Sequence, residues 1–308
     1  MDEATCAPMP PQAVLAATDL SDGAALAEAR AARLAREQGC ALVLLHVLAH
    51  DWLQALREWM GPTAGAERVQ RQTEVTLAQR AEALAAAHGV TVQPCVIEGH
   101  PVAQIVAVAQ RLQPRCIVVG ARGGNPLRRL LLGTTSERLL RKAAHPLLVV
   151  RTPAPDAYRR VLLPVDFSAW SAPTLELAQR FAPQAAVELL HVYTVPFEEK
   201  LRFAGVDDEV IARYRERARQ HASAELHALA HRAGWPPSRY QALLHEGDAA
   251  AAVVEQAQRR GSDLIVIGKH GRSATEELLL GSVTKHVLAE APCDVLLSPA
   301  RADGGRGR

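Results

Sequence analysis

The sequence has few aromatic residues and almost no net charge. Aromatic residues make up 4% of the 308 residues, and 35 lysines and arginines nearly balance 33 aspartates and glutamates, for a formal net charge of +2. A net charge this small does not favour binding to nucleic acid or to an anionic membrane surface. We therefore expect no nucleic-acid partner.

Long apolar runs are also missing. No stretch approaches the roughly 18 consecutive apolar residues of a membrane span. The opening MDEATCAPMPPQ has acidic residues and prolines where a secretory signal would have a basic start and an apolar run. We expect no membrane partner and a cytoplasmic location.

Cysteine is scarce and irregularly placed. The five cysteines are Cys6, Cys40, Cys95, Cys116 and Cys293. No C-x-x-C pair and no cysteine–histidine pair at metal spacing occurs, which argues against a zinc or redox site. Four of them lie in or beside apolar runs, as small buried apolar residues of a reducing compartment do.

The signatures of several nucleotide enzymes are absent. The sequence has no G-x4-G-K-[ST] loop and no G-x-G-x-x-G at the first helix, which argues against P-loop enzymes and dinucleotide oxidoreductases. The H-x-G-H and S-G-G-x-D-S signatures of nucleotidyl transferases and PP-loop ATPases are missing too. No nucleophile paired with a base is evident. These absences favour a binding or regulatory protein over an enzyme.

What the sequence does contain is a repeat. Five landmarks occur twice in the same order, with an offset of 147 residues at the first, 145 at the second and 148 at the later ones. Asp19 corresponds to Asp166, His46 to His191, and Gly120 to Gly268. The repeat predicts a first domain over residues 1–152 and a second over 157–300. Prolines favour a linker over 152–156, and the glycine- and arginine-rich residues 301–308 predict a flexible tail.

Each half alternates short apolar runs with longer stretches of helical periodicity, the pattern of βα units with helices on both faces of a parallel sheet. The predicted fold class is α/β, with two tandem doubly wound domains of five strands each. The expected strands are 14–17, 42–47, 92–97, 116–119 and 147–150, then 161–165, 187–192, 241–244, 264–267 and 295–297. The expected helices of the first half are 23–37, a long stretch ending near His88, 102–112 and 135–144, with counterparts in the second.

A glycine-spaced loop follows the fourth strand of each half, in the pattern G-x2-G-x9-G-[ST]. Backbone N–H groups between a strand and a helix make a natural anion site. Glycines there allow a positive φ and let a phosphate approach without meeting a Cβ, and Thr134 or Thr135 can cap the next helix. Turn glycines without a ligand are the alternative. The loop residues are Gly120, Gly123, Gly133 and Thr134 in the first half and Gly268, Gly271, Gly281 and Ser282 in the second.

This pattern, with the strand-Asp signature before it, resembles the ATP-binding branch of the universal stress protein family over nearly all of residues 10–299. The resemblance implies an adenine nucleotide α-hydrolase-like fold with ATP, with or without magnesium, in each half. It places an aspartate near the adenosine, strand backbone against adenine, and the loop on ribose and phosphates. The implied first site is Asp19, Val47, Gly120, Gly123, Gly133 and Thr134. The implied second site is Asp166, Val192, Gly268, Gly271, Gly281 and Ser282.

Several alternatives stay open at this point. Arg122 and His270 stand between the loop glycines and can offset phosphate charge or be surface residues. Asp19 and Asp166 can serve as loop acceptors alone, and His46 and His191 are expected to be packing residues. The expected function is an ATP-binding stress-response regulator, with a slow ATP hydrolase or a nucleotide-free scaffold as alternatives. We expect the two domains to pair with each other through their last strands and leave a homodimer open.

Overall fold

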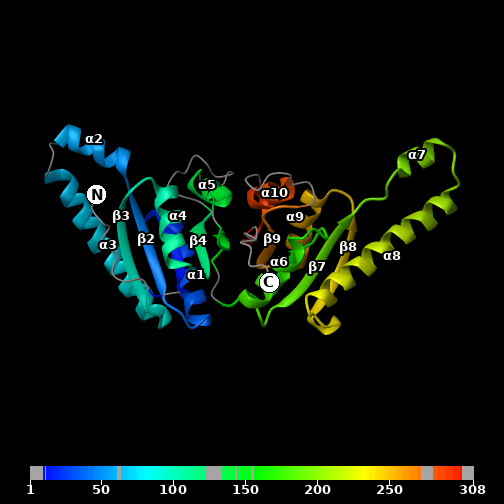
Figure 1. Ribbon diagram of the computed structural model, residues 1–308, viewed down its shortest axis with the longest axis horizontal. Coiled ribbons are helices and arrows are strands. Elements are labelled where there is room, and N and C mark those ends of the chain that lie inside the picture. The colour runs from blue at the N-terminus through cyan, green and yellow to red at the C-terminus, as the bar shows by residue number, and fades with distance from the viewer. Residues whose placement is uncertain are drawn as a thin grey trace, which may run out of the picture. The chain divides into compact units, whose positions relative to one another are not determined.

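The computed structural model describes residues 10, 12–60, 64–121, 134–142, 144–153, 156–271 and 280–299. The chain divides into two compact units, Met1–Ala157 and Tyr158–Arg308 (Figure 1). No helix in these described ranges is long and apolar enough to cross a bilayer. The predicted tail, 301–308, lies outside the described residues, as does part of the predicted linker.

The described strands of the first unit form a parallel sheet in the order β3-β2-β1-β4-β5. Helix α1 packs with α3, and α4 packs with α5. Because the chain steps in one direction from β1 to β3 and in the other from β3 to β5, right-handed crossovers place these two helix pairs on opposite faces. The strands are β1 (Val14–Thr18), β2 (Leu42–Ala49), β3 (Val92–Gly99), β4 (Cys116–Gly120) and β5 (Leu147–Val150). The helices are α1 (Asp22–Glu37), α2 (His50–Met60), α3 (Ala64–His88), α4 (Pro101–Leu112) and α5 (Thr134–Lys142).

The second unit repeats this topology in the order β10-β9-β6-β7-β8. Helices α6 and α8 pack together, and so do α9 and α10. The strands are β6 (Arg160–Pro164), β7 (Ala186–Tyr193), β8 (Tyr240–Glu246), β9 (Leu264–Gly268) and β10 (Asp294–Ser298). The helices are α6 (Ser171–Phe181), α7 (Glu198–Phe203), α8 (Asp208–Arg232), α9 (Ala249–Arg260) and α10 (Ser282–Glu290).

The core of each unit is its sheet. Strands β5 and β10 are buried at every position, and β1, β4 and β9 at nearly every one, as expected where helices cover both faces of a parallel sheet. Helix α1 buries Ala27, Ala31 and Ala35. These small side chains let the helix axis approach the sheet closely.

The predicted fold class is confirmed, and all ten expected strands are present. One prediction needs revision, because the long helical stretch ending near His88 is two helices, α2 and α3. The sequence has glycine and proline at positions 61 and 62, two residue types that disfavour a continuous helix. The expectation that the cysteines are buried apolar residues of a reducing compartment also needs one correction. Cys116 and Cys293 are buried as expected, but Cys95 is disulfide-bonded.

Candidate functional site

In the second unit, strand order reverses beside β6. This strand pairs with β7 on one side and β9 on the other, and the chain leaves these strands toward opposite faces of the sheet. Ligands of doubly wound folds bind in the crevice that such a reversal opens at the carboxyl ends of the strands. The candidate site is therefore expected where β6 and β9 end.

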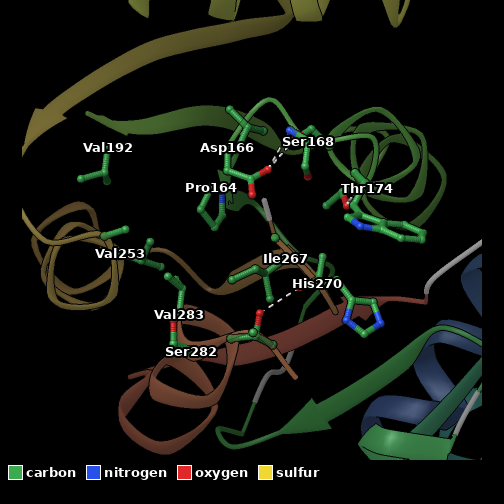
Figure 2. Close-up of a pocket in the computed structure, with 18 of the residues that line it drawn as sticks. Pro164, Asp166, Ser168, Thr174, Val192, Val253, Ile267, His270, Ser282 and Val283 are labelled. Atoms are coloured by element: carbon green, nitrogen blue, oxygen red, sulfur yellow. Dashed lines mark hydrogen bonds between the residues drawn. The ribbon is translucent and has the colours of Figure 1, made fainter. Parts of the chain in front are cut away.

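A cavity of about 860 Å³ lies at this place (Figure 2). Its walls come from the ends of β6, β7 and β9 and from the first turns of α6, α9 and α10. Every second-half residue that the sequence analysis named for the site lines it. These residues are Asp166, Val192, Gly268, His270, Gly271, Gly281 and Ser282.

One end of the cavity is apolar. Leu190 and Val192 of β7, Val253 of α9 and Ile267 of β9 contribute its lining, together with Pro164 at the end of β6. Figure 2 shows Val192, Val253, Ile267 and Pro164 around one part of the cavity. Aliphatic walls of this kind suit a flat, weakly polar ring system.

The other end of the cavity is built from backbone. A Cβ on Gly271 would lie 2.9 Å from Asp166 Oδ2, and a Cβ on Gly268 would lie 3.2 Å from the carbonyl oxygen of His270. Neither these two glycines nor Gly281 has φ in the left-handed region, so the expectation of a positive φ is wrong for these three. Glycine is needed at positions 268 and 271 because a larger side chain would collide with the loop or enter the cavity.

The first turn of α10 borders the same end. Gly281 is its N-cap, and no described side chain accepts a hydrogen bond there. The hydroxyl cap that the sequence predicts for Thr134 or Thr135 in the first half has no counterpart here, because Ser282 is the first helical residue. Thr284 Oγ1 instead donates to the carbonyl of Gly268 at 2.9 Å and ties the helix to the end of β9. Backbone N–H groups at such a helix start favour an anion.

Asp166 is held by the turn that joins β6 to α6. Its Oδ1 accepts hydrogen bonds from the backbone N–H of Ser168 at 3.0 Å and from the Ser171 hydroxyl at 3.1 Å (Figure 2). Phe167, between these residues, has a left-handed φ of 61°. One carboxylate oxygen therefore acts as the loop acceptor that the sequence left open, while Oδ2 lies toward Gly271.

Two histidines of this unit differ in role. His270 is 5% exposed and lines the cavity, with its ring centroid 5.6 Å from the ring of Trp170. His191 Nδ1 is 2.8 Å from the carbonyl oxygen of Val165, and its ring lies 4.0 Å from that of Phe167. His191 is the packing residue that the sequence predicted.

The first unit shows part of the matching site. Asp19 Oδ1 accepts hydrogen bonds from the backbone N–H of Ser21 at 3.1 Å and from its hydroxyl at 2.6 Å. Val47 lies in β2 near its carboxyl end and Gly120 ends β4. Thr134 and Thr135 begin α5, whose first side chains are not described. Arg122, Gly123 and Gly133 lie outside the described residues.

His46 is the first-unit counterpart of His191. Its Nδ1 is 2.9 Å from the carbonyl oxygen of Thr18, an arrangement in which a neutral ring donates to the backbone. Burial lowers the pKa of His46 below its usual range, against smaller opposing effects of this hydrogen bond and of the Asp19 charge. His46 is thus a neutral packing residue near pH 7.

Sequence reasoning missed several cavity residues. Trp170, Ser171 and Thr174 of the α6 start line the cavity, and Ser171 holds Asp166 directly. At an offset of 147, Ala24 and Ala27 stand in the first half where Ser171 and Thr174 stand in the second. A comparison of the two halves therefore could not identify them.

Comparison with known proteins gives a consistent result. The model of the family described as "Universal stress protein family" matches residues 11–151 and 157–299. A universal stress protein of Mycolicibacterium smegmatis is 29% identical over 299 residues, which cover 92% of this chain and 96% of that protein. One from Thermus aquaticus is 35% identical over 142 residues, covering 46% of this chain and 98% of that protein. The crystal structure of a universal stress protein from Archaeoglobus fulgidus shares the fold at 20% identity, with a TM-score of 0.67 over 94% of this chain and 99% of that chain.

Proposed function

The chain belongs to the universal stress protein family, and we propose that it is a stress-response regulator that binds ATP at the carboxyl edge of the sheet in each domain. One observation carries this proposal. Seven residues named from the sequence alone, spread from Asp166 to Ser282, line a single cavity of about 860 Å³ in the second domain. Their convergence from three strands and a helix is what a ligand site requires and a set of turn residues does not.

The chemistry of the cavity fits the two ends of the nucleotide. The aliphatic surfaces of Val192, Val253 and Ile267 would hold the base. At the other end, the glycines provide room for phosphate groups, because a Cβ on Gly271 would already meet Asp166 at 2.9 Å. The start of α10 adds N–H groups and the positive end of the helix dipole.

A magnesium ion would take its oxygen ligands mainly from the triphosphate. Among the residues that the structure describes, no three histidine, cysteine, aspartate or glutamate side chains gather as a metal site would require. Magnesium in nucleotide sites is commonly held by one or two carboxylates plus phosphate oxygens and water. The protein then contributes the shape of the site and its backbone dipoles.

Slow hydrolysis is the main enzymatic alternative. Asp166, the carboxylate at the cavity, already accepts two hydrogen bonds through Oδ1 from the turn that holds it. A carboxylate held in this way is suited to orienting a ligand. It is less suited to activating water, since a general base must be free to reach the proton that it removes. Binding is therefore expected to outlast turnover.

The proposal is tested by identifying nucleotide released from the denatured pure protein and by calorimetric titration with ATP and magnesium. The parent chain is compared with Gly271→Val, which crowds the second cavity, and with the control Ala212→Val on the exposed face of α8. We expect Gly271→Val to weaken binding at the second domain at least about tenfold and the control to bind like the parent. If no nucleotide is released and no heat of binding is measured, the protein is better explained as a nucleotide-free interaction scaffold.

A further inference from the structure

The turn that carries Asp19 is strained at its centre. Leu20 has φ of 62°, a left-handed conformation that is unfavourable for a residue with a Cβ. Phe167 has φ of 61° at the corresponding place in the second domain. Because the same unfavourable conformation occurs twice beside a proposed ligand group, each domain needs contacts that hold it.

In the first domain these contacts form a closed ring. The N–H of Leu20 donates to Thr18 Oγ1 at 3.0 Å, and the Thr18 hydroxyl donates to Glu28 Oε1. Arg80 donates through Nη1 to the same Glu28 oxygen at 2.9 Å and through Nη2 to the carbonyl oxygen of Leu20 at 2.7 Å. The ring therefore holds both backbone polar groups of the strained residue.

The ring joins three elements. Glu28 lies on α1, Arg80 on α3 and Thr18 at the end of β1. The Glu28 side chain is 5% exposed and that of Arg80 27%. A buried ion pair seldom adds net stability over apolar residues of similar size. Its presence here therefore points to a requirement for geometry.

The second domain holds the same turn by other means. At an offset of 147, Val165 stands for Thr18 and Leu175 for Glu28, so neither ring partner is present. Phe167 instead lies against the ring of His191 at 4.0 Å, and the Ser171 hydroxyl holds Asp166 Oδ1. Two different sets of contacts thus preserve one backbone conformation.

We propose that Glu28 and Arg80 are positioning residues of the first nucleotide site, which fix the strained turn so that the Asp19 carboxylate is presented at the carboxyl edge of the sheet. Asp19 directly precedes Leu20, and its Oδ1 is bonded to Ser21 on the other side of that residue. A change in the Leu20 backbone therefore moves both the carboxylate and its partner. This inference rests on the proposed function of the first domain.

The test separates positioning from packing by removing both charges together. Glu28→Leu with Arg80→Met leaves no unpaired buried charge, so the domain should still fold. Arg80→Lys keeps a charge beside Glu28 but lacks the forked donors that reach Leu20. A rescue variant adds Thr18→Val and Leu20→Phe to the double change. In it, a phenylalanine at position 20 can pack against His46, as Phe167 packs against His191 in the second domain.

Each variant is made in full-length protein carrying Gly271→Val, so that ATP with magnesium titrates the first domain. Hydrogen exchange of residues 18–24 reports the turn without nucleotide, and thermal unfolding reports stability. We expect the double variant to bind about tenfold more weakly, or about 1.4 kcal/mol, with faster exchange at the turn and a retained cooperative transition. The Lys variant should bind more weakly as well, and the rescue variant should recover affinity.

Two results would overturn the inference. One is an unchanged exchange rate at the turn in the double variant, and the other is faster exchange with unchanged ATP affinity. If the Gly271→Val parent binds no ATP, the proposed function of the first domain is wrong and the positioning role fails with it. Failure of the proposed function can be told apart from failure of the positioning role, because it appears in the Gly271→Val parent before any ring residue is changed.

Discussion

At the scale of single residues, the second-domain loop distinguishes glycines by the space around them. A Cβ on Gly271 would lie 2.9 Å from Asp166 Oδ2, whereas the nearest atom to a Cβ on Gly281 would be Thr284 Oγ1 at 3.6 Å, an ordinary contact. We expect Gly271→Ala to lower the free energy of unfolding by about 1–3 kcal/mol, the usual effect of overpacking. Gly281→Ala should change it by less than about 1 kcal/mol. Denaturant unfolding of the two variants measures the difference.

Two variants of Gly271 test what this glycine does for a ligand. If Gly271→Ala and the larger Gly271→Val both titrate ATP like the parent, Gly271 serves the loop alone. The repeat predicts that Gly123→Val acts in the same way on the first domain without affecting the second.

The partly buried His46 ring gives the first domain a pH-dependent stability. Its pKa in the folded state is lowered from the usual 6.5, chiefly by burial, so the unfolded chain binds the proton more readily. The stabilising contribution is present above the unfolded pKa and is lost as pH falls below about 6.5. We expect the free energy of unfolding to decline less steeply between pH 7 and pH 5 in His46→Gln than in the parent. Parallel pH profiles for the two proteins would contradict this reading.

At the scale of elements, the two domains anchor the helix after their second strand differently. Glu98 of β3 accepts hydrogen bonds from Arg57 at 3.1 and 3.2 Å and lies 2.9 Å from His50 Nδ1, and both partners are on α2. The hydrogen bonds of Arg57 are the main cause of a lowered pKa of Glu98. Helix α7 is instead tied to α8 by Glu198, which accepts hydrogen bonds from Arg215.

Removing the Glu98 charge should loosen α2 locally. Exposed ion pairs are worth about 0.2–1 kcal/mol, so Glu98→Gln should speed hydrogen exchange in α2 by up to about fivefold. The matched control is Glu246→Gln, at the corresponding place in β8, which should leave α7 unchanged. Equal exchange of α2 in the parent and in Glu98→Gln would show that apolar packing around Leu53 anchors the helix instead.

At the scale of the whole molecule, the tandem repeat predicts two nucleotides per chain and slow turnover. We expect a stoichiometry of two in titration and phosphate release far below the order of 1 per second that marks a slow enzyme. The parent is compared with a Thr134→Ala and Ser282→Ala double variant over hours. Rapid release in the parent that disappears in the double variant would make this protein an ATPase, and a stoichiometry of one would show that one domain has no working site.

The last strand of each domain raises a further whole-molecule prediction. Strands β5 and β10 each lie at one end of their own domain's strand order, and an uncovered sheet edge invites pairing. We expect these segments to be covered in solution, by pairing of the two domains or of two chains. Hydrogen exchange should show slow exchange in both, and free exchange in both would contradict the prediction. Light scattering decides between the two forms of pairing.

The sequence by itself determined the fold class, the repeat and the residues that line the second-domain cavity from the ends of its strands. Strand positions followed from apolar runs such as 116–119 and 264–267, because parallel strands covered on both faces need consecutive apolar residues. Gly268 and Gly281 followed from the glycine spacing of a loop that ends a parallel strand, and the role of Asp166 was implied by the resemblance to the universal stress protein family. These features are local patterns, which the chain order records directly.

Tertiary structure alone decided how those residues are held. Gly271 is required by the nearness of Asp166, which is 105 residues away in the chain, and not by its own φ. Ser171 takes over the bond to Asp166 that Ser21 makes to Asp19 in the first domain, and Arg80 reaches Leu20 from a helix 60 residues further along the chain. Such contacts depend on the packing of distant elements, which spacing and periodicity do not encode.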